Sequence, residues 1–258
     1  DTLRRKMAKL LSLSPADVGE LQIVKQSVDA RKKDQIHLVC TVRAQVPRES
    51  AILRRNLRQV KPVVRQVYHF PRVGRTGGAK PVVVGMGPAG LFCALFLARA
   101  GIPCIVLERG KPVEQRVKDV ERFWTTGDLD PDSNVQFGEG GAGTFSDGKL
   151  NTSVKDPGGR NNFVLETFVK FGAKSDILYD NKPHIGTDIL ADVIVNMRKE
   201  LENNGTTFMF DTLADGFEIS DGRICSVNAS GQKINTDVCV LALGHSSRDT
   251  FYKLHDLG

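Results

Sequence analysis

Three glycines stand at the spacing of a phosphate-binding turn in VVVGMGPAGLFCALFLARAGIPCIVLE, residues 82–108. Gly85 permits a tight turn, Gly87 lets the backbone approach a pyrophosphate, and Gly90 allows close packing of helix on strand. Glu108 ends the next apolar run, where it can accept hydrogen bonds from both ribose hydroxyls and disfavour a 2′-phosphate. The pattern predicts that a dinucleotide binds at the positive end of a helix.

A second glycine-rich stretch, GEGGAGTFSDGKL at residues 138–150, repeats the spacing with Gly138, Gly140 and Gly143. The preceding SNVQF is short and polar, and the following residues show no helical apolar stripe, so a second Rossmann turn is not expected here. We interpret the stretch as backbone that lies against the same ligand and offers N–H donors to it. A flexible loop without a ligand is the alternative.

The surrounding residues predict the elements that position these loops. PVVVG (81–85) and IPCIVLE (102–108) are short apolar runs typical of strands buried on both faces, and a helix is expected between them at 90–101. A helix over 187–201, a strand at 206–210, three short strands over 215–235 and an apolar strand at 238–244 are expected next. The sequence therefore predicts an α/β fold, a Rossmann-type domain over residues 80–258 with a parallel sheet and a β-meander.

Residues 1–75 predict a separate small α+β domain. Helices are expected at 2–11 and 50–58 and antiparallel strands at 21–28 and 35–46, with 63–70 as a candidate third strand. PRVGRTGGAK, residues 71–80, is typical of a linker, which places a boundary near 72–79.

Charge divides the chain at the same place. Residues 1–80 carry 18 Lys and Arg against 6 Asp and Glu, whereas residues 81–258 carry 18 against 24. A domain this basic either presents a solvated or internally docked surface or contacts nucleic acid or a larger assembly.

Several classes of protein and site are not expected. No apolar run approaches the roughly 20 residues of a membrane-spanning helix, and the first residues lack a secretory signal. The five cysteines occur singly, without CxxC, which predicts reduced thiols and no metal site. A GxSxG nucleophile elbow is missing as well. We expect a cytoplasmic protein, although the interior of a plastid or mitochondrion, after loss of a transit peptide, would suit the same features.

The combination of GMGPAGLF, ERG, FWTTGDLDPDSNVQFGEGGAGTFSDGKL, KPHIGTD and LALGHSSRDTF resembles one family. It is a widespread family of FAD-dependent dehydrogenase-like flavoproteins within the glutathione-reductase-type FAD/NAD(P)-binding superfamily, most of whose members lack an assigned substrate. SVDARKKDQIH is similar to the small leading domain of that family. Members are generally much longer, so the resemblance implies a truncated FAD-binding domain, with the start of a substrate domain around residues 151–210.

The resemblance also implies a set of FAD contacts. The ADP half would be held by Gly85, Gly87, Pro88, Ala89, Gly90, Glu108 and Arg109, with Ala214 near the adenine. The pyrophosphate and flavin would be approached by Gly140, Gly141, Ala142, Gly143 and Thr144, and the cofactor would be closed from the other side by Ala242 and Gly244.

No catalytic residue can be transferred from the family. From its place in SDGKL, Lys149 is a candidate cation beside the flavin, where it would stabilise the reduced, anionic ring. His184 in KPHIGTD and His245 in GHSSRD are candidate acid–base groups. Structural or solvent-facing roles are the alternative for both histidines.

The leading hypothesis is an FAD-dependent oxidoreductase that transfers a hydride between the flavin and a small or lipidic substrate. Because only one Rossmann fingerprint is present, NAD(P)H or another electron donor is expected to be external. The alternative is a non-catalytic protein whose basic residues 1–80 bind RNA or an assembly. A third hypothesis, a flavin-dependent RNA-modifying enzyme, combines flavin chemistry with RNA binding.

Overall fold

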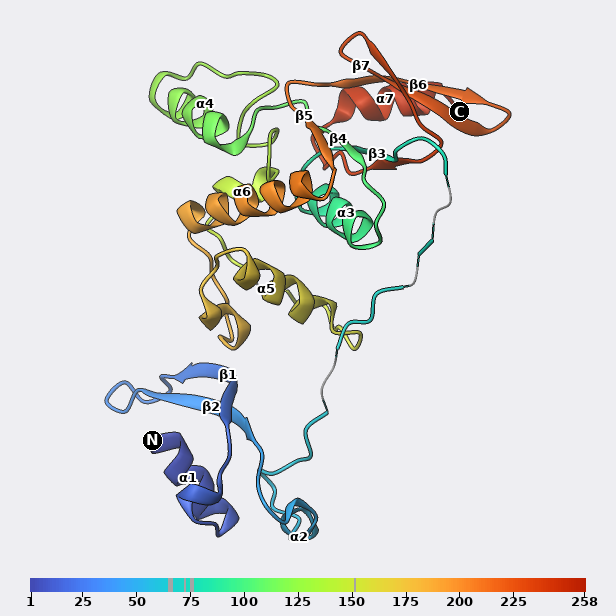
Figure 1. Ribbon diagram of the computed structural model, residues 1–258. Coiled ribbons are helices and arrows are strands. Elements are labelled where there is room, and N and C mark those ends of the chain that lie inside the picture. The colour runs from blue at the N-terminus through green and yellow to red at the C-terminus, as the bar shows by residue number, and fades with distance from the viewer. Residues whose placement is uncertain (65–66, 72, 75–76, 151) are drawn as a thin grey trace. The chain divides into compact units, whose positions relative to one another are not determined.

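The computed structural model describes residues 1–64, 67–71, 73–74, 77–150 and 152–258. It divides into two compact units (Figure 1). The first unit consists of Asp1–His69, Lys149–Val169 and Lys174–His184, and the second of Phe70–Gly148, Lys170–Ala173 and Ile185–Gly258. The candidate strand at 63–70 and the linker at 71–80 fall partly outside the described residues, and the described part of 63–70 contains no strand. The domain boundaries expected from sequence stay a prediction.

The first unit begins with a helix and a hairpin, as the sequence predicts. Helix α1 (Thr2–Leu11) is followed by a short 3-10 turn (Pro15–Asp17) that starts with a capping box on Ser14, and then by β1 (Leu21–Asp29) and β2 (His37–Ala44). The strands pair antiparallel from Leu21 opposite Ala44 to Asp29 opposite His37. Helix α2 (Glu49–Arg54) is shorter than the helix expected at 50–58.

The core of this part of the chain is small. The buried apolar side chains between α1, α2 and the hairpin are Ala8, Leu11, Val18 and Ile52. Helix α5 (Arg160–Lys170), which the sequence analysis did not predict, lies mostly in the same unit and is followed by a 3-10 turn (Ser175–Leu178). Asp180 then forms a parallel bridge with Gln26 on the edge of β1.

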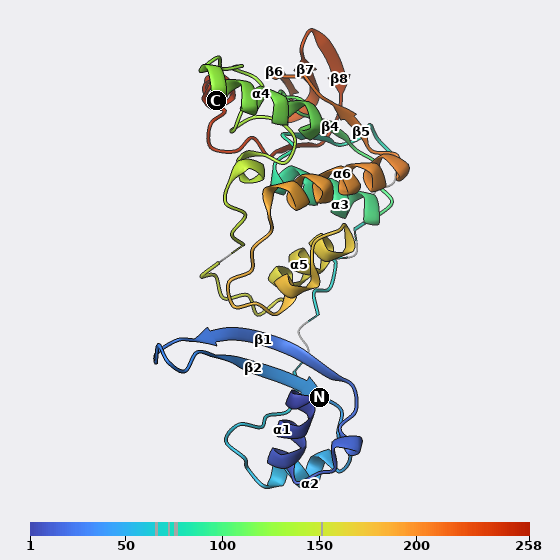
Figure 2. The same ribbon diagram turned by 90° about the vertical axis from the view of Figure 1, so that its left-hand side faces the viewer.

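The second unit is built on a four-stranded parallel sheet, which confirms the predicted fold class. Its strands are β3 (Val82–Val84), β4 (Ile105–Leu107), β5 (Thr207–Met209) and β9 (Cys239–Leu241), in the order β5-β4-β3-β9. Helices α3 (Pro88–Arg99) and α6 (Thr187–Asn203) contact each other on one side of the sheet (Figures 1 and 2). Covered strands of this kind need apolar side chains on both faces, which explains why β3 is entirely Val.

The other side of the parallel sheet faces the predicted β-meander. Strands β6 (Ala214–Ser220), β7 (Arg223–Ala229) and β8 (Gln232–Asn235) pair antiparallel in that order. One hydrophobic cluster joins the two sheets, and its buried members are Val82, Val84, Leu107, Ala214, Phe217, Val227 and Ala229. Helix α7 (Arg248–Asp256) packs against β6.

Two helices of the second unit were not predicted from the sequence. Helix α4 (Val113–Thr126) follows β4 and ends at Gly127, and α7 follows β9. The second glycine-rich stretch forms a short 3-10 turn at Ala142–Phe145. Among the helices in the described residues, none combines the length and the apolar composition required to cross a bilayer.

Candidate functional site

A cavity of about 520 Å³ opens in the second unit where β3, β4 and β9 end. Its wall is drawn from residues within five segments, 84–89, 107–109, 136–143, 212–214 and 241–254. Ligands of open α/β sheets bind in the crevice outside the carboxyl ends of the strands, and this cavity lies at that edge. It is therefore the candidate site.

Most of the residues singled out from the sequence line this cavity. They are Gly85, Gly87, Pro88, Ala89, Glu108, Arg109, Gly141, Ala142, Gly143, Ala214, Ala242, Gly244 and His245. Gly90, Gly140 and Thr144 belong to the same unit but are not among the lining residues. The contacts that each would make with FAD stay predictions.

Lys149 and His184 belong to the first unit, where they lie opposite each other in an antiparallel bridge. The backbone N–H of Leu150 donates to the carbonyl of Pro183 at 3.0 Å beside this bridge. The structure thus brings two of the three candidate catalytic residues together and places the third, His245, at the cavity. Their catalytic roles stay predictions.

The two glycine loops meet at the cavity wall. The backbone N–H of Gly140 donates to the carbonyl of Met86 at 2.9 Å. A Cβ on Gly141 would lie only 3.0 Å from the Cα of Gly87, and Gly141 has φ +67°. Because a side chain at Gly141 would press on Gly87 and the φ of Gly141 disfavours other residues, glycine is needed at position 141 for this approach.

The first loop is shaped by close packing inside the protein. Gly85 has φ +99°, and a Cβ there would overlap the carbonyl oxygen of Ala242. A Cβ on Gly90 would in turn overlap the carbonyl oxygen of Gly85. The turn from β3 into α3 is therefore held tightly against the end of β9, with the first turn of α3 at the cavity.

Glu108 connects both loops through its carboxylate. Its Oε2 accepts from the N–H of Met86 at 2.8 Å, and its Oε1 accepts from Gly110 and Gly138, each at 3.0 Å. The residue is only 6% exposed. Three charge-assisted hydrogen bonds from backbone N–H groups to this carboxylate therefore hold the two loops in place without help from a ligand. The ribose contact expected of Glu108 stays a prediction.

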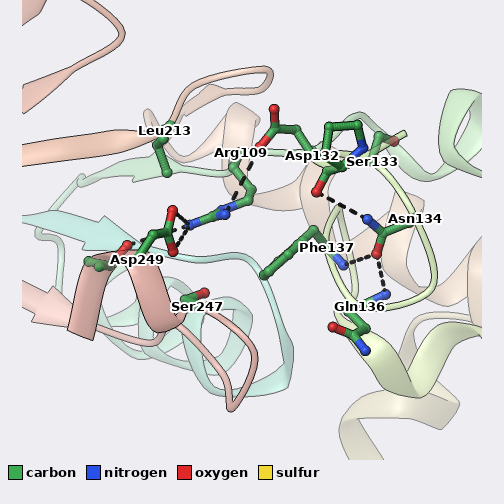
Figure 3. A network of polar contacts seen from close by, with 12 residues as sticks. Arg109, Asp132, Ser133, Asn134, Gln136, Phe137, Leu213, Ser247 and Asp249 are labelled. Atoms are coloured by element: carbon green, nitrogen blue, oxygen red, sulfur yellow. Dashed lines mark hydrogen bonds and ion pairs between the residues drawn. The ribbon is translucent and has the colours of Figure 1, made fainter. Parts of the chain in front are cut away.

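Arg109 joins three segments at the cavity (Figure 3). Its Nη2 donates to both carboxylate oxygens of Asp249 on α7 at 2.8 Å, and its guanidinium lies 4.3 Å from the ring centre of Phe137. Nη1 is also 4.0 Å from Asp132. Burial acts against the charge of Asp249, but the hydrogen bonds from Arg109 and the backbone of Thr250, together with the charges of Arg109 and Lys253, outweigh it, and the pKa of Asp249 is lowered.

Arg116 on α4 organises the second loop, and the sequence analysis missed it. Its side chain is fully buried and donates to four carbonyl oxygens. These belong to Asn134 at 2.8 Å, Val135 at 2.9 Å, Gly138 at 3.3 Å and Glu139 at 2.6 Å. Burial lowers the pKa of Arg116 to about 10, and the nearby Glu108 and Glu139 oppose that shift. A usable signal existed, because Arg116 lies three residues from Val113 and four from Val120, on the apolar side of a helical pattern.

A second polar cluster supports the same loop from outside. Lys111 Nζ donates to Asp119 at 2.9 Å and to Asp130 at 3.3 Å, and Ser133 Oγ donates to Asp119 at 2.7 Å. The hydrogen bond to Asp119 raises the pKa of Lys111. Residues 130–139 are therefore held by α4 along most of their length.

Thr144 and Gly140 are packed against α6 instead of facing the cavity. Thr144 is 1% exposed, and a Cβ on Gly140 would overlap its Oγ1 and lie 2.5 Å from the Ile194 Cδ1. The glycine at 140 is thus required by packing inside the protein.

The cavity wall fits a dinucleotide. Pro88 begins α3, and the backbone N–H groups of Ala89 and Gly90 follow in its first turn, a common arrangement for phosphate. A Cβ on Gly143 or on Gly244 would meet no atom within 4 Å, so both present bare backbone in the cavity wall. In the part of the chain that the structure describes, no group of three or more His, Cys, Asp or Glu could hold a metal ion.

Comparisons with known proteins agree with the cofactor class. Residues 79–119 match the family model of an FAD binding domain, and residues 1–45 match a domain of unknown function, DUF8436. An uncharacterised protein of Clostridium beijerinckii is 42% identical over 257 residues, which cover 99% of this chain and 48% of that protein. The chain therefore spans about half the length of the curated relative it matches.

Solved structures similar to this chain are distant. THI4 of Thermovibrio ammonificans superimposes with a TM-score of 0.44 at 16% identity, over 69% of this chain and 62% of that one. An FAD-dependent pyridine nucleotide-disulphide oxidoreductase of Desulfovibrio vulgaris gives a TM-score of 0.33 at 17% identity, over 69% of this chain and 28% of that one.

Proposed function

We propose that the second unit binds FAD and that the protein is an FAD-dependent oxidoreductase. The observation that carries the proposal is the meeting of two glycine loops at the first turn of α3, beside a cavity of about 520 Å³. The match of residues 79–119 to an FAD binding domain supports the choice of dinucleotide.

Different residues of the chain would bind different parts of the cofactor. The first turn of α3 would receive the pyrophosphate on its free N–H groups, and Gly141 to Gly143 would lie along the cofactor as bare backbone. Ala214 and Leu213 would give an apolar contact to the adenine. Bound FAD supplies the capacity to accept or donate a hydride.

We propose the substrate and the electron donor by chemical class: a small or lipidic organic substrate and an external electron donor such as NAD(P)H. His245 lines the cavity and is the acid–base candidate that this geometry favours, because a proton-transfer group must lie within reach of the reacting atoms. The contribution of Lys149 is tested separately by the flavin reduction potential of Lys149→Met.

The visible absorption spectrum of the purified chain, before and after reconstitution with FAD, tests the proposal. We expect the bands of bound flavin in the wild type and their loss in Gly143→Val, because the added side chain would fill the cavity. Gly74→Val is the matched control, since a Cβ at Gly74 also meets no atom within 4 Å and Gly74 is not a lining residue. A wild type that binds no FAD, alone or in a longer chain, would overturn the proposal.

A second candidate function rests on the hairpin of the first unit. Lys25, Arg43 and His37 share the polar face of the β1–β2 pair, and Arg31 to Lys33 follow at its exposed tip. The negative charge of Asp29 on this face is engaged by Arg31 at 2.6 Å, which lowers the pKa of Asp29 to about 2. We propose RNA as the partner of this alternative, because a basic two-stranded ribbon presents cations to a phosphate backbone.

Binding of a fluorescent RNA duplex as a function of salt tests this alternative. We expect affinity to fall steeply with salt, and the double variant Lys32→Glu and Lys33→Glu to weaken binding at least tenfold. Lys118→Glu with Lys253→Glu changes the net charge equally on exposed positions of the second unit and serves as the control. Equal losses of RNA affinity in both double variants would show that the change in net charge, and not the hairpin, causes the weaker binding.

A further inference from the structure

We propose that Glu139 is a positioning residue whose proton is linked to cofactor binding, so that a dinucleotide binds more tightly when Glu139 is protonated. The inference rests on the proposed FAD site and concerns a side chain behind the cavity wall. Glu139 stands between Gly138 and Gly140 in the second glycine loop and is fully buried. It is not among the residues that line the cavity.

The carboxylate of Glu139 is only partly satisfied. Oε2 accepts from the N–H of Val113, the first residue of α4, at 2.8 Å. Oε1 makes no hydrogen bond and lies 3.4 Å from Nε of Arg198 on α6. A buried carboxylate oxygen without a hydrogen bond disfavours the ionised form, because desolvation costs more than one ion pair with a shared arginine returns.

The charges around Glu139 are mixed. Arg198 is shared, since its Nη2 is 2.5 Å from Glu114 on α4. Glu202 on α6 adds a second negative charge, and Arg116 on α4 donates to the backbone carbonyl of Glu139 at 2.6 Å. Burial raises the pKa of Glu139 to about 7, against the N–H of Val113 and the charge of Arg198.

The loop that carries Glu139 also carries the proposed pyrophosphate contacts. Gly138 and Gly141 line the cavity, and the N–H of Gly140 holds the loop to Met86 of the first turn. A pyrophosphate at this wall brings negative charge toward the buried carboxylate and raises its pKa further. By linkage, the bound state holds more protons, and affinity falls as pH rises from about 7 toward the higher pKa of the complex.

Calorimetric titration of the reconstitutable apoprotein with FAD between pH 6 and pH 8.5 tests the inference. FAD is the suitable probe because its pyrophosphate diester keeps the same charge over this range. We expect the dissociation constant of the wild type to rise about fivefold and that of Glu139→Gln to lose this slope. Glu114→Gln is the comparison variant: it removes an exposed carboxylate from the same arginine and leaves Glu139 in place, so it should keep the pH dependence but move it to lower pH.

Proton uptake gives a second readout that needs no variant. Titrations at pH 7 in buffers of different ionisation enthalpy should show protons bound together with FAD by the wild type, and none bound by Glu139→Gln. If Glu139→Gln fails to fold, two other measurements test the inference. The wild type should take up protons when it binds FAD, and Arg198→Met should move the midpoint of the pH dependence upward, because Arg198 is the cation nearest Oε1. An unchanged slope in a folded Glu139→Gln, or no uptake in the wild type, overturns the inference while FAD binding stands. If the protein binds no FAD at either pH, the proposed function is overturned instead.

Discussion

Gly138 lies directly against the buried side chain of Arg116, so closely that a Cβ on Gly138 would overlap the Cδ of Arg116. Gly138 also has φ +118°, a backbone conformation that favours glycine. The same guanidinium donates to the carbonyl oxygens on both sides of this contact, those of Val135 and Glu139. The buried guanidinium of Arg116 and the absence of a side chain at Gly138 therefore define the conformation at the start of the second loop.

Gly138→Ala is expected to lower the free energy of unfolding by about 2–4 kcal/mol, because the added methyl group meets both a buried arginine and an unfavourable φ. Chemical denaturation measures the change. Gly143→Ala is the control, since its Cβ would meet no atom within 4 Å and its φ is not positive, and we expect a change below about 0.5 kcal/mol there. Equal losses in the two variants would contradict the packing account.

Arg116→Met is expected to lower the free energy of unfolding by about 3–5 kcal/mol, because carbonyl oxygens of residues 134–139 lose a buried donor. Arg116→Lys keeps the charge but cannot reach all four carbonyls, so it should recover only part of the loss. Urea titration gives both values. A fully stable Arg116→Lys would show that charge alone, rather than the planar fork, holds the loop.

Glu108→Gln is expected to destabilise the chain by about 1–3 kcal/mol, since the new amide group can no longer accept all three backbone N–H groups. Glu218→Gln makes the same chemical change at a carboxylate that pairs with Lys233 on the meander and should have a small effect. Thermal unfolding compares the two. A stable Glu108→Gln with weakened FAD binding would instead favour the ribose contact.

Stability should depend on pH through Glu139. Its pKa is raised from 4.5 to about 7 in the folded protein, so between these values the folded state binds more protons than the unfolded chain. Stability is therefore expected to fall as pH rises through this window. Glu139→Gln removes the buried charge and should be more stable than the wild type by about 1–3 kcal/mol at pH 8, with a smaller difference at pH 5. A constant difference at both values would contradict this assignment.

The sequence predicted the elements whose signals are local and strong. The apolar runs that became β3, β4 and β9, the glycine turn before α3 and the long stripe of α6 all appear in the structure. Helix α4 was not predicted, although Val113, Val117 and Val120 recur at helical spacing before Gly127. Helix α7 is short and polar, so its pattern carries little signal.

The candidate site was predictable only where backbone geometry decides it. Glycine spacing indicated both loops, because tight turns and close approaches leave a mark in residue type. The partners of Arg116, Glu139 and Arg109 were not predictable, since they join segments far apart in the chain, as Arg109 does with Asp249. Long-range pairs of this kind depend on the folded arrangement of several helices, which periodicity does not describe.

The strand order of the parallel sheet has a consequence for synthesis. Strand β3 pairs on one side with β4, which follows it closely, and on the other with β9, so that Val82 faces Cys239. On the ribosome, β3, α3 and β4 emerge early, while the carbonyl of Ala242 that closes the Gly85 turn is made only after residues 86–241. The nascent chain must therefore carry an open apolar strand edge while the residues between β3 and β9 are made, a period in which a chaperone or an early ligand would have the greatest effect on yield.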